Sequence, residues 1–153
     1  MSSADVYRNL RASLVAFCKN LIPVLQARFP QYTGGLSAQD FDTFQEEKDL
    51  PQMDCLGTAH TSFEVNNHVV SIETMIGVST LADKNMFRLH DWMSVVFEAV
   101  RPGAQIPYLD ADTGEVLGSF TILDGTRAMP VGGGNRPARF FVLTALLGVT
   151  IPG

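Results

Sequence analysis

The sequence predicts an α+β fold, in which two helices pack on one face of a mostly antiparallel sheet in the order α-β-β-α-β-β-β. Two stretches carry apolar residues at helical spacing, and the stretches between and after them read as strands. The chain has 153 residues, 46% of them hydrophobic, so it is long enough for a core that needs neither a disulfide nor a metal. We therefore expect a single domain over residues 1–153.

The N-terminal segment predicts the first helix. Its apolar stripe has helical spacing and consists of Val6, Leu10, Leu14, Phe17, Leu21 and Leu25. Ser2 or Ser3 is expected to act as the N-cap. Pro23 is expected to kink or end the helix and Pro30 to close the segment, because proline removes a backbone donor.

Residues 31–54 are predicted to form a polar, acidic insert. The pair Gly34-Gly35 and Pro51 disfavour regular structure, and the acids of the segment are Asp40, Asp42, Glu46, Glu47 and Asp49. A loop of this length in a small domain is usually functional or mobile. Its aromatic side chains either pack back onto the core or face a partner, and they are Tyr32, Phe41 and Phe44.

A β-hairpin is predicted after the insert, with CLGTAHTSFEV and HVVSIETMIGVST joined by a tight turn at Asn66-Asn67. One face of the second strand consists of Val70, Ile72, Thr74, Ile76 and Val78. The other face consists of Ser71, Glu73, Gly77 and Ser79. This alternation predicts a sheet with one face covered by a helix.

The second helix follows, with Asp83 or Asn85 expected as its cap and Pro102-Gly103 as its end. Its apolar stripe consists of Leu89, Trp92, Met93, Val96 and Val100. The last third is β again, with IPYL and EVLGSFTIL flanking the turn DADTG. The segment from Arg139 to Ile151 is apolar on both faces, which predicts a long final strand in the centre of the sheet.

Charge and cysteine content exclude several classes of protein. The net charge of -5 disfavours tight non-specific binding of nucleic acid, which requires a basic face. Cys18 lies among apolar helix residues and is interpreted as a small core residue, not a redox group. The N-terminus carries Asp5 and two arginines before any apolar run, unlike a secretory signal. The run FFVLTALLGVTI is shorter than the ~20 residues of a membrane-spanning helix, so we expect a soluble protein.

The segment VGGGNRPARFF, from Val131 to Phe141, has the glycines of a phosphate-binding loop but lacks its other features. It has no GK[ST], and a strand follows it where a P-loop requires a helix. We interpret it as a hairpin loop that either has no role or becomes ordered against a neighbour. In the second case, Arg136 and Arg139 would form ion pairs with an acidic partner surface.

The sequence predicts no catalytic, cofactor-binding or metal-binding residue. Asp110 and Asp112 resemble the start of a calcium loop, but the glycine and the glutamate that such a loop requires are replaced by Glu115 and Thr121. A hairpin turn with Gly114 at positive φ explains this stretch. The histidines have no metal-ligand spacing, and they are His60, His68 and His90. A dyad of Cys55 with His60 or His68, and a carboxylate pair in the insert, remain less favoured alternatives.

The arrangement of these elements resembles the tail terminator (tail completion) proteins of long-tailed bacteriophages. Four segments carry the resemblance: VYRNLRASLVAFCKNLIPVLQARFP, FEVNNHVVSIETMIGVST, KNMFRLHDWMSVVFEAV and FTILDGTRAMPVGGGNRPARFFVLTALLGVTI. They cover nearly the whole chain, and the likeness lies in the order and length of the elements. The insert at 31–54 departs from the pattern.

The resemblance implies a structural virion protein that is not an enzyme. Such a subunit forms a homo-oligomeric ring, commonly a hexamer, which caps the tail tube and joins the tail to the head and neck. Its partners would be copies of itself, the tail tube protein, the head completion or neck protein and, in a contractile tail, the sheath protein. It would be made in the host cytoplasm and reside in the virion, with DNA passing through without specific binding and with no membrane contact.

Two other functions stay open at this point: a head–tail connector or tail-tube-like phage protein, and a small hydrolase that uses carboxylates of the insert. On the tail terminator interpretation, the insert and the glycine-rich loop are suited to becoming ordered against a neighbour. The predicted partner-binding residues are therefore Asp40, Asp42, Phe44, Glu46, Glu47, Gly132, Gly133, Gly134, Asn135, Arg136 and Arg139.

Overall fold

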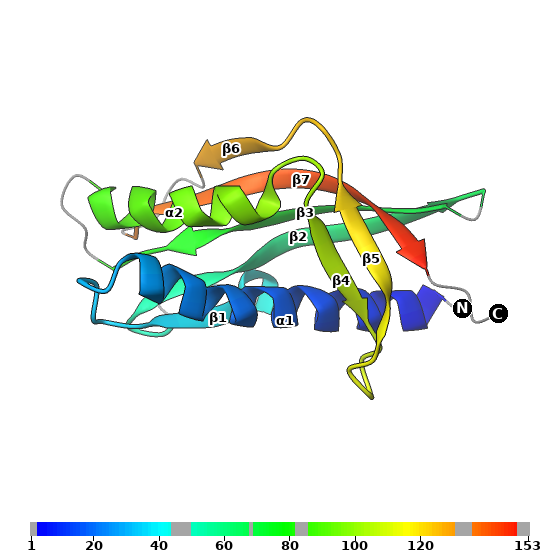
Figure 1. Ribbon diagram of the computed structural model, residues 1–153, viewed down its shortest axis with the longest axis horizontal. Helices are drawn as coiled ribbons and strands as arrows, with labels where there is room; N and C mark the ends of the chain where they lie inside the picture. The colour runs from blue at the N-terminus through cyan, green and yellow to red at the C-terminus, as the bar shows by residue number, and fades with distance from the viewer. Residues whose placement is uncertain (1–2, 44–49, 68, 82–85, 131–135, 150–153) are drawn as a thin grey trace.

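Two helices and seven strands are present in the part of the chain that the computed structural model describes, residues 3–43, 50–67, 69–81, 86–130 and 136–149 (Figure 1). These residues form a single compact α+β domain, as the sequence predicts. The elements in chain order are α1 (Ser3–Arg28), β1 (Leu36–Asp40), the 3-10 helix η1 (Phe41–Thr43), β2 (Asp54–Asn66), β3 (Val69–Ser79), α2 (Phe87–Val100), β4 (Gln105–Leu109), β5 (Val116–Ile122), β6 (Arg127–Pro130) and β7 (Ala138–Val149).

The sheet is mixed but mostly antiparallel, with the strand order β1-β2-β3-β7-β5-β4 and with β6 paired to β7. Among the described strands, the β1–β2 pair alone is parallel. β7 pairs with β3 on one side and with both β5 and β6 on the other. The closing strand is therefore central, and this prediction is confirmed.

The predicted order of elements is wrong in omitting β1 and β6. Strand β1 lies inside the segment predicted to be a loop, where Leu36–Asp40 pairs in register with residues 54–58 of β2. Its sequence, LSAQD, has one strongly apolar residue, so the alternation that marks a strand is missing. β6 has four residues and is recognisable only through its pairing with β7.

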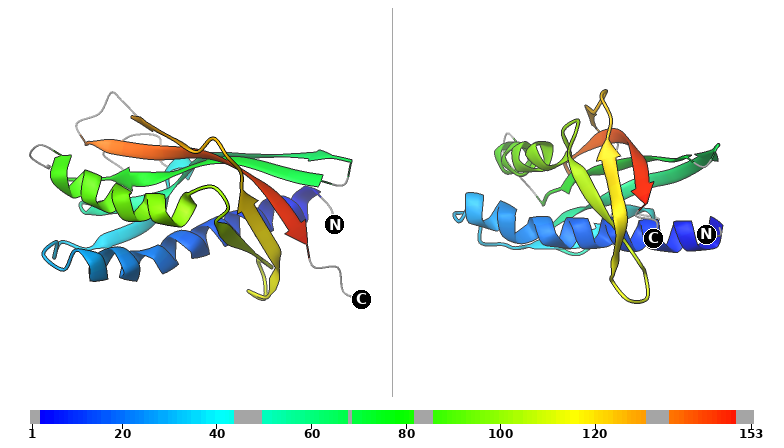
Figure 2. Two further views of the ribbon diagram at one scale, coloured as in Figure 1. Left: turned by 45° about the horizontal axis from the view of Figure 1, so that its top comes forward. Right: turned by 45° about the vertical axis from the view of Figure 1, so that its right-hand side comes forward.

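The packing of the helices also differs from the prediction. Helix α1 contacts β1 and β2 at one end of the sheet and β4 at the other, whereas α2 contacts the central strands β3 and β7. The sheet thus curves around α1 instead of presenting one flat face to two helices, and β4 and β5 cross over α1 in the views of Figures 1 and 2.

The apolar stripe predicted for α1 faces the core, and the stripe residues that are buried are Val6, Leu10, Leu14, Leu21 and Leu25. Pro23 was expected to kink or end this helix. It does not end the helix, because α1 continues to Arg28. The carbonyl that loses its donor belongs to Lys19, which is exposed, while buried Leu21 and Leu25 anchor the helix on either side. No helix in the described residues is long and apolar enough to cross a membrane.

Helix α2 buries all five residues of its predicted stripe, which are Leu89, Trp92, Met93, Val96 and Val100. Its N-cap position is occupied by Met86 in a left-handed conformation, without a side-chain cap. The expected caps, Asp83 and Asn85, lie outside the described residues. Cys18 is buried in the core as predicted, and burial, followed by the charge of Asp40, raises the pKa of its thiol to about 12.

The second face of β3 is covered as well, which corrects the prediction of a sheet covered on one face only. Gly57 of β2 and Gly77 of β3 stand opposite each other in the register. A Cβ at Gly77 would lie 2.7 Å from the Phe140 ring, and one at Gly57 would lie 3.1 Å from the Phe41 ring. The two rings pack edge to face, with centroids 5.2 Å apart. The glycines thus provide a floor for a small second core that also contains Ala59, Met75 and Ala138.

Candidate functional site

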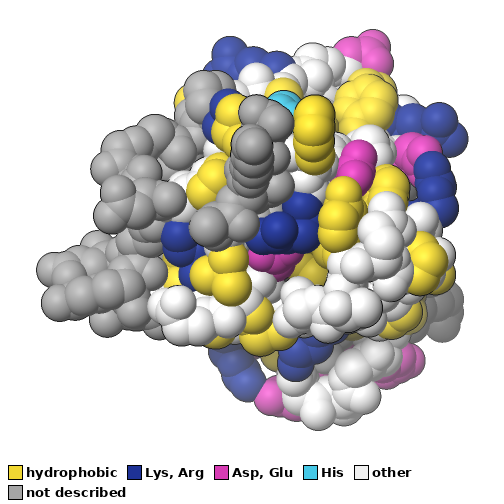
Figure 3. Space-filling model, turned by 90° about the vertical axis from the view of Figure 1, so that its left-hand side faces the viewer, with side chains coloured by type: hydrophobic (Ala, Val, Ile, Leu, Met, Phe, Trp, Pro, Cys, Tyr) yellow, Lys and Arg dark blue, Asp and Glu magenta, His cyan; other side chains and the backbone are white. Residues whose placement is uncertain are grey.

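Arg136 holds together the flanks of the two segments that the sequence predicts to bind a partner. It lies at the start of the last strand, next to the glycine-rich segment, and its guanidinium donates to carbonyls at the end of the insert. Nη1 donates to the Pro51 carbonyl at 2.8 Å, and Nη2 donates to the carbonyls of Met53 at 2.6 Å and Ser79 at 3.3 Å. The end of the insert, the end of β3 and the start of β7 therefore meet at one end of the molecule. Figure 3 faces this end and shows basic side chains on both sides of an acidic one.

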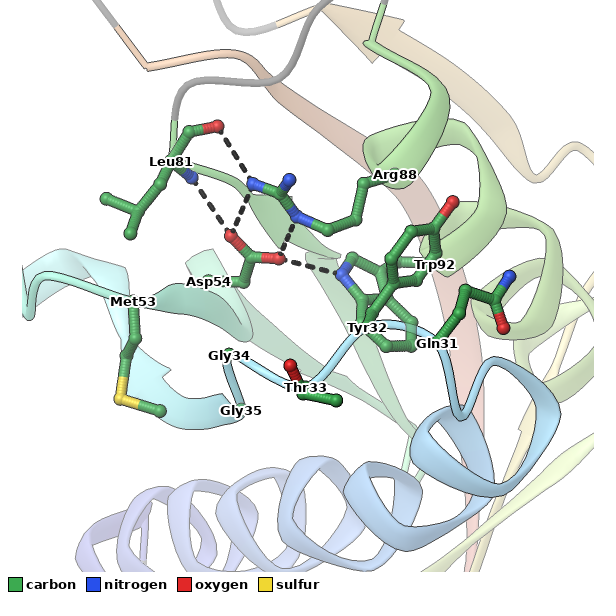
Figure 4. A pocket seen from close by; sticks show the side chains of 10 residues that line it. All are labelled: Gln31, Tyr32, Thr33, Gly34, Gly35, Met53, Asp54, Leu81, Arg88 and Trp92. Atoms are coloured by element: carbon green, nitrogen blue, oxygen red, sulfur yellow. Dashed lines mark hydrogen bonds and ion pairs between the residues drawn. The ribbon is translucent and has the colours of Figure 1, made fainter.

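The centre of this end is the buried carboxylate of Asp54, the first residue of β2 (Figure 4). Arg88 of α2 donates to it from Nε at 2.6 Å and from Nη2 at 3.1 Å. Trp92 Nε1 donates at 2.9 Å, and the backbone N–H of Leu81 donates at 3.0 Å. Arg88 also donates to the Leu81 carbonyl at 3.1 Å. A buried charge is stabilised only by such partners, so this network fixes the start of β2, the end of β3 and α2 to one another.

A pocket of about 400 Å³ opens beside this network. Its walls include Met53, the loop residues 31–35 and the aromatic pair Tyr32 and Trp92, whose ring centroids are 5.3 Å apart (Figure 4). The hydroxyl of Tyr32 donates to Asp91. Tyr32 and Phe41 thus pack onto the core, which resolves for these two aromatics the alternative that the sequence left open; Phe44 lies outside the described residues.

Asp40 and Asp42, the two predicted partner-binding acids within the described residues, both accept hydrogen bonds from the chain. Asp40 forms an ion pair with Arg11 at 3.2 Å and accepts the backbone N–H of Asp42 at 3.0 Å. The two oxygens of Asp42 accept the backbone N–H of His60 at 3.0 and 2.9 Å. His60 has a φ of 51°, at the irregularity where the β2–β3 register shifts. Asp42 therefore stabilises the bulge in β2, and Asp40 holds the backbone of Asp42 in place.

The other predicted partner-binding residues are divided between the described and undescribed parts of the chain. Arg139 Nη1 donates to the Ala138 carbonyl at 2.8 Å, and its Nη2 lies 3.9 Å from the Met86 sulfur. Arg139 lies in β7, and Arg136 lies two residues before this strand begins. The remaining predicted residues lie outside the described residues: Phe44, Glu46, Glu47, Gly132, Gly133, Gly134 and Asn135.

The groups considered for metal binding form no ligand set within the described residues. Gly114 has a φ of 73°, as the predicted hairpin turn requires. Asp110 accepts the backbone N–H groups of Thr113 and Asp112, and these bonds lower the pKa of its carboxyl. His60 and His90 are exposed, and His68 lies outside the described residues. Within the described residues, no group of three or more metal-ligating side chains is present.

Burial raises the pKa of the Cys55 thiol, and the nearby charge of Arg136 opposes this effect. The Arg136 guanidinium lies 3.7 Å from the sulfur, in addition to its carbonyl contacts. Cys55 is the residue that the sequence offered as one member of a dyad with His60 or His68. In the structure the Cys55 sulfur forms hydrogen-bond contacts with the Met53 carbonyl and with Arg136.

Sequence reasoning missed the Asp54–Arg88 pair. It read Asp54 as the end of the insert and Trp92 only as part of the apolar stripe, whereas 34 positions separate Asp54 from Arg88. The sequence did contain one signal. Asp54 stands directly before the apolar residues of β2, and a charged side chain that is buried there needs a partner. No family model matches this sequence, and no curated protein matches it either.

Proposed function

We propose that this chain is a structural subunit of a bacteriophage tail, a tail-terminator-like protein that forms a ring at the end of the tail tube. The contact of Arg136 with Pro51 and Met53 carries the proposal. It ties the flank of the glycine-rich segment to the end of the insert, so a partner would meet both segments at one end of the molecule. Hydrogen bonds from one arginine to several carbonyls hold the segments at this end of the molecule in a fixed position.

The fold and the hydrogen bonds that Asp40 and Asp42 accept support the same function. The domain is α+β, with a long first helix and a long central closing strand, and these are two of the features that suggested the tail terminator proteins. Asp40 and Asp42, two of the insert carboxylates that a hydrolase could use, are acceptors of internal hydrogen bonds. Small domains of this kind gain buried surface when a head-to-tail interface repeats until it closes.

The molar mass of the purified chain tests the ring. We expect multi-angle light scattering to give one discrete oligomer whose subunit number does not increase with concentration, because a closed ring has no free interface. A mass that grows steadily with concentration would indicate open chains. A monomer at every concentration, both alone and after incubation with tail tubes, would contradict the proposal.

Deletion of the three glycines Gly132, Gly133 and Gly134 tests the role of that end in joining. We expect the free energy of unfolding to change little, because a surface loop contributes little core burial. We expect joining of tails to heads to fall sharply, as counted in electron micrographs of particles assembled with the variant. A matched control replaces the three glycines with serines and keeps the length of the loop. Full joining by the deletion variant would contradict a role for this segment.

A further inference from the structure

The outer edge of β2 is covered along only part of its length. β1 pairs with residues 54–58 of β2, and Asp42 of η1 accepts the backbone N–H of His60. Residues 61–66 have no described strand on their outer side. They belong to the hairpin that extends beyond β5 and β7, beside the N-terminal end of α1 (Figure 1). An edge of this kind leaves a row of backbone groups without a strand partner.

The register of the hairpin shows which of these backbone groups point outwards. Asn66 and Val69 form the last pair before a two-residue turn, and such a closing pair exchanges both of its N–H···O bonds. Hydrogen-bonded and non-hydrogen-bonded pairs alternate along an antiparallel ladder. The N–H and C=O groups of Val65 and Phe63 therefore point away from β3, to the uncovered edge, where they can pair with an added strand.

Apolar side chains lie beside the same edge. Phe63 packs edge to face against Tyr7 of α1, with ring centroids 5.6 Å apart. Val65 lies on the same face of β2 as Phe63, and its side chain is 55% exposed, while that of Tyr7 is 53% exposed. Glu64 is the one charged residue of 61–66, and it lies on the other face. This stretch has no proline or lysine, the residues that commonly protect an edge from pairing.

A cavity of about 100 Å³ lies between α1 and β2 next to this edge. Tyr7, Leu10 and Leu14 line it from α1, and Thr58 and Thr61 line it from β2. Thr61 is the first uncovered residue of β2, so the cavity adjoins the uncovered edge. A strand added to β2 turns every second side chain towards α1, and the cavity has room for one aliphatic side chain.

We propose that the groove between α1 and residues 61–66 of β2 binds an extended segment of another protein. The segment adds to β2 as an antiparallel strand and places an aliphatic side chain in the cavity. The outward backbone groups supply affinity, and the cavity and the Tyr7 ring select apolar residues at alternate positions.

The occupant is assigned to another protein because the strands at the opposite edge of this sheet pair poorly. β4 and β6 each contain a proline, Pro107 and Pro130, which has no backbone N–H to donate. The groove does not depend on the proposed ring, since a monomer offers the same edge. Loss of the ring would therefore leave this proposal in place, and loss of the groove would leave the ring in place.

N-methylated peptides test the backbone part of the proposal. The probe is a fluorescein-labelled peptide of alternating valine and threonine residues, and fluorescence anisotropy measures its binding to the full chain. In an antiparallel pair, the residues opposite Phe63 and Val65 turn their side chains towards α1 and their amides towards β2. Methylation of the valine amides should therefore weaken binding about tenfold or more, and methylation of the threonine amides should leave it unchanged. Equal effects, a larger effect at threonine, or no binding of the unmethylated peptide would overturn the proposal.

Two substitutions at residue 65 test the same bonds from the side of the protein. Val65→Pro removes the outward N–H without removing a bond to β3, so the far-UV circular dichroism spectrum should stay that of the wild type. We expect Val65→Pro to bind the peptide about tenfold or more weakly, and Val65→Thr, which keeps the donor, to bind it as the wild type does. Equal binding by the two variants would overturn the role of this edge.

The apolar wall has a matched control on the same helix. Tyr7→Ala removes a side chain that lines the cavity, whereas Val24→Ala changes a similarly exposed residue, 48% exposed, that does not line it. We expect weaker peptide binding by Tyr7→Ala and unchanged binding by Val24→Ala, and equal effects would overturn the placement of the segment against α1. Sedimentation velocity should give the same mass for the wild type and Val65→Pro. A smaller oligomer in Val65→Pro would mean that a second copy occupies the edge, which would overturn the assignment to another protein.

Discussion

Replacing Trp92 with alanine is expected to lower the free energy of unfolding by about 3–5 kcal/mol, the range for truncating a large aromatic in a packed core. Trp92 is fully buried and packs edge to face against Phe29 and Tyr32, with centroids 5.9 and 5.3 Å away. Its Nε1–H also donates to Asp54. The substitution therefore leaves a cavity and removes one of the donors that stabilise a buried charge.

Equilibrium urea unfolding followed by far-UV circular dichroism measures this loss. Circular dichroism is the appropriate signal because Trp92 is the single tryptophan of the chain, so the variant has no tryptophan fluorescence. Phe87→Ala is a matched control on the same helix: its side chain is 66% exposed, and the change should stay within about 0.5 kcal/mol. A loss below about 1 kcal/mol for Trp92→Ala would mean that the stripe of α2 does not form the core.

The second large effect is expected from Asp54→Asn, at about 3 kcal/mol of lost stability. The substitution keeps the size of the side chain but leaves Arg88 without its counter-charge. The value is at the low end of the range for breaking a buried pair, because the Arg88 side chain is 24% exposed. The charge-assisted bonds from Arg88 and Trp92 are weakened together.

An exposed ion pair provides the control for Asp54→Asn. Arg28 and Glu98 also form two contacts, at 3.1 and 3.3 Å, but both side chains are 54% exposed. Glu98→Gln makes the same chemical change and should cost less than about 1 kcal/mol, since solvent screens exposed pairs. A double-mutant cycle with Arg88→Met should then show coupling of about 0.5–3 kcal/mol between Asp54 and Arg88. Equal losses for Asp54→Asn and Glu98→Gln would contradict a structural role of the buried pair.

Local patterns in the sequence were sufficient to predict the helices and the longer strands. The stripe around Trp92 has a period set by the helix itself, so it can be read without knowledge of the partner. The same holds for Ile72, Thr74 and Ile76 on one face of β3, which are buried as predicted. The apolar character of the closing strand on both faces likewise predicted its central position.

Features that depend on contacts between distant residues could not be predicted. β1 is recognisable only through its parallel pairing with β2, because its own residues show no alternation. The second core depends on Gly57 and Gly77 standing opposite each other, with Phe41 brought over them by η1. The candidate site also depends on a contact between distant residues. Arg136 donates to Pro51, which lies 85 positions earlier in the chain, so the sequence alone could not predict this contact.

Electron microscopy of tail tubes incubated with the purified chain tests the central claim most directly. The account predicts a ring of discrete subunit number at one end of each tube, with an open channel along its axis. The end of the molecule at which Arg136 contacts Pro51 and Met53 should face the same way in every subunit. Tubes whose ends stay bare, or copies of the chain bound along the tube wall without closing around the axis, would contradict it.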